Sequence, residues 1–294
     1  MNNNKYQKMK NNIILAFSLI LILTGCSSEA SDNPTAKEII ETVKSNLTCQ
    51  WSKNTVDTFK AGDPDAEVTG IATTFIVTMD VLQRALDLNC NLIITHEPTF
   101  YNHLDEVDHL KNDLVYQEKL KFIEENGLIV FRFHDHWHRT QPDGIFKGMI
   151  DKLEWQNYQV DPDVLVFKFP ESTVGEFAAS LKEKFNNSPV RVIGDTGMKF
   201  TEVGLSPGAP GYMNHVRMLE RDDVEVLVAG EVPEWESINY VRDADGLDMK
   251  KAMILLGHVN SEEAGMEYLA TWLNDIIEDI PIHFVPAGDP FWTP

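Results

Sequence analysis

Histidine and carboxylate residues cluster at three places where an apolar run of the sequence ends. The three segments read "IITHEPTF", "FRFHDHWHRT" and "LLGHVNSEE". In open α/β sheets, functional groups collect at the C-terminal ends of the strands, so the three segments are expected to meet. The side chains concerned are His96 and Glu97 in the first segment, His134, His136 and His138 in the second, and His258 and Glu262 in the third.

Imidazole and carboxylate together are typical ligands of Zn, Mn, Fe or Ni, whereas an all-oxygen set would favour Mg or Ca. His258 and Glu262 are four residues apart across an expected strand-to-helix turn, so both side chains can face one point. Adjacent side chains diverge on a regular strand, but a turn beginning at Pro98 lets His96 and Glu97 converge. The pattern predicts a divalent-metal site; the alternative is three unrelated polar strand ends.

The three histidines of the second segment occupy every second position, and their use depends on the local backbone. If the segment stays extended, all three face the same side, since side chains alternate along a strand. If the chain turns after Phe133, the histidines separate. We expect Trp137, which lies among them, to belong to the core or to a pocket wall.

The elements that must position these residues alternate between strand and helix patterns. A capping box of Thr35 and Glu38 opens the first expected helix. Strand, helix, strand, helix and strand patterns follow, which is the order of an α/β architecture with right-handed crossovers. The strands are expected within 62–75, 91–96 and 128–134, and the helices within 78–89 and 113–127.

The pattern starts again near residue 163, which predicts two interlocked α/β lobes of about 35–160 and 161–294 with the metal site between them. The last helix is expected to begin at a capping pair of Asn260 and Glu263. Strands of the second lobe are expected within 164–170, 190–195, 200–208, 224–232 and 252–258, and helices within 172–186, 234–244 and 260–279.

Several motifs occur in an order that resembles a known family. They are "GDPDAEVTGIA", "NLIITHEPTF", "VRVIGD", "VGLSPGAPG", "LVAGE" and "GHVNSEEAGMEYLATWL", and the resemblance covers roughly residues 35–294. The chain is similar to the Nif-three-like dinuclear metal proteins, many of which are called type 2 GTP cyclohydrolase homologues. The resemblance implies the Nif-three-like fold, two metal ions per subunit and a toroidal homo-hexamer built from dimers.

The resemblance also implies a ligand set, with two departures. The family uses a His–His pair, an aspartate and a C-terminal His-x-x-x-Glu, which correspond here to His96, His258 and Glu262. Glu97 stands where the family has its second histidine, and His138 stands where it has the aspartate. The numbers of imidazoles and carboxylates are thus preserved, which favours a working site. The alternative is that one exchanged residue does not bind and a single ion is held.

The predicted activity is metal-dependent hydrolysis of an unknown small molecule, since two metals can activate a water and clamp both oxygens of the reaction. Glu262 is the candidate bridging carboxylate. His134, which matches the family motif's own histidine, and His136 are the acid–base candidates because imidazole titrates near neutral pH. The alternative is a non-catalytic metal-binding or scaffold hexamer. GTP ring opening is a weaker candidate, since no Gly-rich phosphate loop or basic cluster accompanies these residues.

The N-terminus predicts export and lipid attachment. Three lysines precede the eleven-residue run "IILAFSLILIL", which is too short to span a bilayer, and "LTGC" resembles a lipobox ending at Cys26. We expect residues 1–26 to be a lipoprotein signal peptide, residues 27–34 a polar tether, and Cys26 to anchor the protein to a bacterial envelope membrane outside the cytoplasm. An ordinary signal peptide with an incidental cysteine is the alternative.

Composition limits the partners. The whole chain has a formal net charge of −21, and without residues 1–26 it keeps 22 basic and 46 acidic residues, a net charge of −24. A field of that sign repels nucleic acid. Cys49 and Cys90 remain after processing; they form no Cys-x-x-Cys motif, and the sequence leaves open whether they pair.

Overall fold

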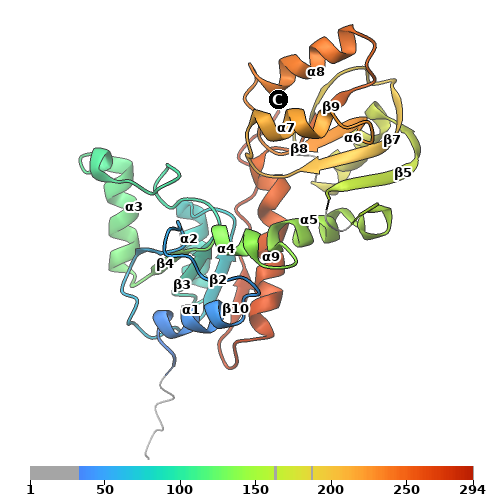
Figure 1. The fold of residues 1–294 in the computed structure, drawn as a ribbon. Helices are drawn as coiled ribbons and strands as arrows, with labels where there is room; N and C mark the ends of the chain where they lie inside the picture. Colours follow the sequence, from blue (N-terminus) through green and yellow to red (C-terminus); the bar gives the residue numbers. More distant parts are fainter. Residues whose placement is uncertain (1–32, 162–163, 187, 294) are drawn as a thin grey trace, which may run out of the picture. The chain divides into compact units, whose positions relative to one another are not determined.

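Two five-stranded sheets form the framework of the chain (Figure 1). The computed structural model describes residues 33–161, 164–186 and 188–293, so Cys26 and the expected signal peptide lie outside the described residues. The α/β class expected from the sequence is confirmed. Among the described residues, no helix is long and apolar enough to cross a membrane.

The first sheet has the strand order β1-β4-β3-β2-β10, with β1 antiparallel and the other strands parallel. Every residue of β2, β3 and β4 is buried, as the continuous apolar runs predict for inner parallel strands. The strands are β1 (Phe59–Ala61), β2 (Ile71–Thr74), β3 (Leu92–Thr95), β4 (Ile129–Arg132) and β10 (Ile282–Phe284), and the accompanying helices are α1 (Ala36–Ser45), α2 (Met79–Asp87) and α3 (Leu114–Glu125).

The second sheet has the order β5-β7-β8-β9-β6, with a parallel centre and an antiparallel strand at each edge. Its strands are β5 (Val166–Thr173), β6 (Arg191–Ile193), β7 (Lys199–Ser206), β8 (Val226–Ala229) and β9 (Ala252–Leu255), and its helices are α6 (Val174–Lys184), α7 (Tyr212–Leu219) and α8 (Ser237–Gly246). Short 3-10 turns cover Asp108–Leu110 and Gln156–Tyr158.

Helix α9 (His258–Asn274) connects the two sheets. It follows β9 directly, while its apolar face, including Met266 and Leu269, packs in the core beneath the first sheet with Ile71 and Leu92. The chain then returns to the first sheet, where β10 pairs with β2. Residues 282–284, where no strand was expected, fall within the range of the expected second lobe but belong to the first sheet, so a boundary near residue 160 does not separate the two sheets.

Helix α5 (Gly144–Leu153) crosses α9 at close range. A Cβ atom on Gly148 would lie 2.3 Å from the carbonyl oxygen of Ala264, and one on Gly265 would lie 2.5 Å from the Cα of Ile145. Glycine at both positions lets the two backbones touch. Helix α5 follows the short helix α4 (Asp135–Arg139), and Nε1 of Trp137 in α4 donates to the carbonyl oxygen of Gly265 in α9.

The expected start of the last helix was wrong. Helix α9 begins at His258, with Gly257 at its N-cap, two residues before the expected capping pair of Asn260 and Glu263. The Glu263 carboxylate instead accepts hydrogen bonds from the backbone N–H groups of Ala287 and Gly288. Because His258 and Glu262 thus share one helix at a spacing of four residues, they lie on the same face.

Both cysteines of the described chain are free thiols. Cys90 is buried beside β3, as its apolar surroundings predict, and burial raises the pKa of its thiol to about 11. Cys49 lies in the segment that follows α1.

Candidate metal centre

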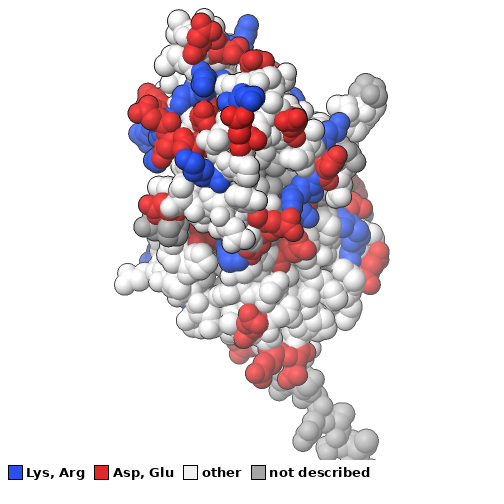
Figure 2. All heavy atoms as spheres, turned by 90° about the vertical axis from the view of Figure 1, so that its right-hand side faces the viewer, with Lys and Arg blue, Asp and Glu red and all other residues white. Residues whose placement is uncertain are grey.

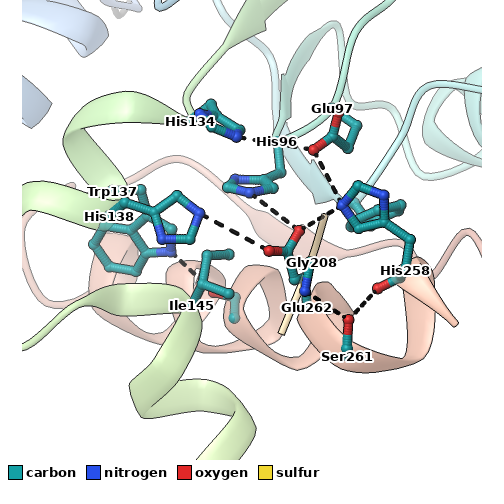
Figure 3. A network of polar contacts seen from close by, with 12 residues as sticks. His96, Glu97, His134, Trp137, His138, Ile145, Gly208, His258, Ser261 and Glu262 are labelled. Atoms are coloured by element: carbon teal, nitrogen blue, oxygen red, sulfur yellow. Dashed lines mark hydrogen bonds and ion pairs between the residues drawn. The ribbon is translucent and has the colours of Figure 1, made fainter. Parts of the chain in front are cut away.

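Four histidines and two glutamates converge at the ends of β3, β4 and β9 (Figure 3). Two of them follow β3, two come from the turn after β4 and from α4, and two come from the first two turns of α9. We call this group the histidine–glutamate centre: it consists of His96, Glu97, His134, His138, His258 and Glu262.

The turn after Phe133 separates the three histidines of "FRFHDHWHRT". The backbone becomes helical at Asp135, and the N–H of His138 donates to the carbonyl oxygen of His134. His134 and His138 therefore lie on one face of α4, in ring contact with each other. His136 points to the opposite side, so the structure does not bring it to the centre.

Glu262 lies in the middle of the group. Its Oε2 is 3.1 Å from Nε2 of His258 and 3.5 Å from Nε2 of His96, and its Oε1 is 4.0 Å from Nε2 of His138. Glu97 approaches from the other side, with Oε1 3.5 Å from Nε2 of His258 and 3.9 Å from Nε2 of His134.

Each of the four imidazoles of the centre has its Nδ1 bonded to an oxygen acceptor outside it. A carbonyl or carboxylate oxygen accepts a hydrogen bond, so Nδ1 carries a proton, and Nε2 is the nitrogen that can bind a metal when it is not protonated. Metal-binding histidines in proteins are held in this way. The pairs are His96 with the carbonyl oxygen of Phe133 (3.3 Å), His134 with Asp135 (3.0 Å), His138 with Asp143 (2.9 Å) and His258 with Glu231 (3.1 Å).

These residues fit a divalent cation. Nε2 of His96 is buried and has no hydrogen-bond partner in the described structure, and buried polar atoms are normally satisfied. In each of two groups of three residues, the potential ligand atoms all lie within 4.8 Å of one another. The two groups are His96 with His134 and His138, and His96 with Glu97 and Glu262.

The surroundings of the centre raise the pKa of one of its histidines and lower the pKa of another. Burial lowers the pKa of His258, but the hydrogen bond and charge of Glu262 outweigh burial and raise that pKa to about 9. Burial, with the nearby His96 and His138, lowers the pKa of His134 to about 3. Burial would raise the pKa of Glu262, but His258 and His96 hold it well below its usual range. The glutamate is therefore a ready anionic ligand.

The loop after β7 reaches Glu262 from the second sheet. The N–H of Gly208 donates to Oγ of Ser261 (2.9 Å), and this hydroxyl donates to the carbonyl oxygen of His258 (2.7 Å). Gly208 has φ +69°, and a Cβ atom there would lie 2.1 Å from Oε1 of Glu262. The "SPGAPG" segment thus needs glycine at this position to let the backbone approach the carboxylate.

Arg132, the last residue of β4, lies behind Glu97 and is fully buried. Its Nε donates to the carbonyl oxygen of His96 (3.0 Å), and its guanidinium also donates to the carbonyl oxygen of His103. Its second terminal nitrogen is 3.7 Å from Oε2 of Glu97. One buried cation therefore supports both residues that follow β3.

The sequence pattern did not reveal every residue that supports the centre. Asp135 and Asp143 accept hydrogen bonds from His134 and His138, and the only sequence feature that could have identified them is that each lies near a histidine. Glu231, noted only within "LVAGE", holds His258. Trp137 lies in the core, where its Nε1 donates to the carbonyl oxygen of Gly265, as expected.

Comparison with known proteins identifies relatives along most of the chain. The family model of Duf34/NIF3 (NGG1p interacting factor 3) matches residues 34–290. The GTP cyclohydrolase 1 type 2 homolog of Clostridium acetobutylicum is 25% identical over 213 residues, which cover 68% of this chain and 75% of that protein.

Two solved structures share the fold. The Bacillus cereus protein related to NIF3 has a TM-score of 0.69 at 16% identity, over 90% of this chain and all of its own. The Staphylococcus aureus hypothetical protein SA1388 has a TM-score of 0.66 at 17% identity, over 89% of this chain and all of its own.

Proposed function

The chain belongs to the DUF34/NIF3 family, and from this premise we propose that it is a metal-dependent hydrolase that binds two divalent ions at the histidine–glutamate centre. One observation carries the proposal. All four imidazoles of the centre fix Nδ1 on an acceptor and direct Nε2 towards Glu97 or Glu262. Metal-binding histidines are almost always held in this way.

His96 would serve one of the two ions. It belongs to both groups of neighbouring ligand atoms, but its Nδ1 faces the carbonyl oxygen of Phe133, which leaves a single nitrogen for a single ion. We assign it to the three-histidine group, together with His134 and His138. His134, expected from the sequence to transfer protons, is thereby assigned to metal binding.

His258 would complete the second group. Its Nε2 is within 3.5 Å of Glu97 and 3.1 Å of Glu262, so it can replace His96 beside the two carboxylates. Glu262 reaches histidines of both groups, which supports a bridging role. Mixed imidazole and carboxylate donors favour Zn, Mn, Fe or Ni.

An accessible centre supports catalysis over a purely structural role. The side chains of His134, His138 and His258 are 22–24% exposed, so solvent can reach them, whereas structural metal sites are closed by protein ligands. Divalent ions held here supply Lewis acidity and lower the pKa of a coordinated water. The protein residues would hold the ions, and Arg132 places a positive charge 3.7 Å from Oε2 of Glu97.

GTP ring opening, which the name of the Clostridium relative suggests, receives less support. The carboxylates of Glu97 and Glu262 lie at the centre and that of Glu231 lies beside it, while the nearby Arg132 is buried and engaged with backbone carbonyl oxygens. A triphosphate would meet little positive charge from side chains. Figure 2 shows acidic and basic side chains interspersed on one face of the described chain, without a continuous basic surface. We therefore favour a less charged substrate.

The proposal is tested on purified protein. We expect about two ions per chain by elemental analysis, in line with a dinuclear site. EDTA should abolish turnover of a panel of phosphoesters, nucleotides and amides, and Mn or Zn should restore it. Stoichiometric metal without turnover would identify a non-catalytic metal-binding protein. Absence of stoichiometric metal would overturn both functions.

We also propose a lipid anchor at Cys26 in the bacterial envelope and assembly into a homo-hexamer. The anchor is supported by "LTGC" after a short apolar run, and the hexamer by family membership. Labelled fatty acid should enter the wild-type protein and not Cys26→Ser. Light scattering of the protein without residues 1–26 should give six times the chain mass; a monomer would contradict the hexamer.

A further inference from the structure

The segment between α1 and β1 directs its polar contacts at α4. Asp57, which is buried, accepts the backbone N–H groups of His134 (2.7 Å), Asp135 (2.9 Å) and His136 (2.9 Å). Helix α4 has no side-chain cap of its own at His134. Asp57 therefore caps α4 from a distant part of the chain.

The same carboxylate holds the ring of His136. Nδ1 of His136 is 2.6 Å from Oδ2 of Asp57, and Nε2 accepts the N–H of Ser52 (2.9 Å). These partners require the proton on Nδ1. Trp51 stacks on the ring at a centroid distance of 3.8 Å. His136 is thus held by Asp57, Ser52 and Trp51, away from the histidine–glutamate centre.

Further contacts of this segment reach the centre itself. Oγ1 of Thr55 donates to Asp135 (2.8 Å), whose other oxygen bonds to Nδ1 of His134. At the far end of α4, the hydroxyls of Thr48 and Thr140 are 3.0 Å apart. The segment thereby holds both ends of a five-residue helix, which is too short to be stable alone.

We propose that Asp57 is a positioning residue of the histidine–glutamate centre: through α4 and His136 it sets His134 and His138 against His96. This role rests on the proposed metal binding. Asp57 touches no proposed ligand side chain; it bonds to the backbone of His134 and to the ring of His136 in the middle of the α4 segment. Without it, three backbone N–H groups lose their acceptor, among them that of the buried His136, and α4 can shift relative to β3.

The test uses Asp57→Asn and His136→Gln. The asparagine oxygen in the place of Oδ1 can still accept the N–H groups of His134 and Asp135. Its NH2 group, in the place of Oδ2, would face the backbone N–H and the Nδ1 proton of His136, so this residue loses its acceptor. We expect zinc affinity to fall about 10–100-fold, the range found for residues that support metal ligands. Amide exchange at residues 134–136 of the metal-free variants should become faster. Asp113→Asn, which alters the cap of α3, is the matched control and should change neither.

The outcomes are distinguishable. Wild-type protein that takes up no zinc would overturn the proposed function, and this role with it. The positioning role alone is overturned if the wild type binds zinc and every variant that folds has a zinc affinity within about twofold of the wild-type value. Unchanged exchange in α4 would also overturn it.

Discussion

His96 and Glu262 face each other in the interior, with Nε2 of the imidazole 3.5 Å from Oε2 of the carboxylate. Both side chains are almost completely buried, although one follows β3 and the other lies on α9. The imidazole nitrogen has no hydrogen-bond partner, and the carboxylate is held in its charged form. A cation beside the pair would satisfy both groups, so the pair is the most direct target for testing metal binding.

Glu262→Gln should abolish most metal binding. The amide keeps the shape of the side chain but removes the charge that His96, His138 and His258 surround. We expect the zinc dissociation constant to rise more than about 100-fold, beyond the effect of supporting residues. Titration calorimetry measures this, and Glu267→Gln, an exposed glutamate of the same helix, should bind as the wild type does.

Asp143→Asn should weaken metal binding by a smaller factor, about 10–100-fold. Oδ1 of Asp143 caps α5 through Ile145 and Phe146, a function that asparagine retains, whereas Oδ2 holds Nδ1 of His138. Thermal stability should therefore change little while affinity falls. Asp195→Asn serves as the control, because the described hydrogen bond of the Asp195 carboxylate comes only from a nearby backbone N–H. Equal affinities in the two variants would contradict a supporting role for Asp143.

Gly208→Ala should displace Glu262 and reduce metal occupancy. The added methyl would lie 2.1 Å from Oε1 of Glu262, in addition to the strain of a positive φ. Gly127→Ala is the matched control, because Gly127 also has positive φ, at +60°, and has nothing within 4 Å of the added atom. The control should lose only about 1–2 kcal/mol of stability, and full metal occupancy in Gly208→Ala would contradict the crowding.

The sequence located the centre through its strand ends. His96, Glu97, His258 and Glu262 come after short continuous apolar runs, and such runs predict strands whose ends meet. Helix α4 was not predictable, because five residues are too few for a periodic pattern. Without α4, the choice between three aligned histidines and a separated His136 stayed open.

Other features depend on contacts between distant segments. Asp57 precedes His134 by many residues and lies in a loop without periodicity, so nothing in the sequence joins them. Helix α5 carries Gly144 and Gly148, which weaken a helical pattern, yet the crossing with α9 requires Gly148. Helix α9 begins at His258 because the glycine before it adopts φ +86°, whereas Asn260 and Glu263 looked like a better cap.

Lys119 should make stability rise with pH in the alkaline range. Its side chain is buried, Nζ donates to the carbonyl oxygens of Val77 (2.5 Å) and Thr99 (2.6 Å), and burial lowers its pKa to about 8. In the unfolded chain the pKa is about 10.4. Between these values the unfolded state binds more protons, so folding becomes more favourable as pH rises. Relative to Lys119→Met, the wild type should gain on the order of 1–3 kcal/mol in unfolding free energy between pH 7 and 10.

Urea denaturation of both proteins across this range measures the difference, and Lys121→Met, at an exposed position of the same helix, should show no such trend. A constant or falling difference between wild type and Lys119→Met would show that the buried amine does not titrate in this range.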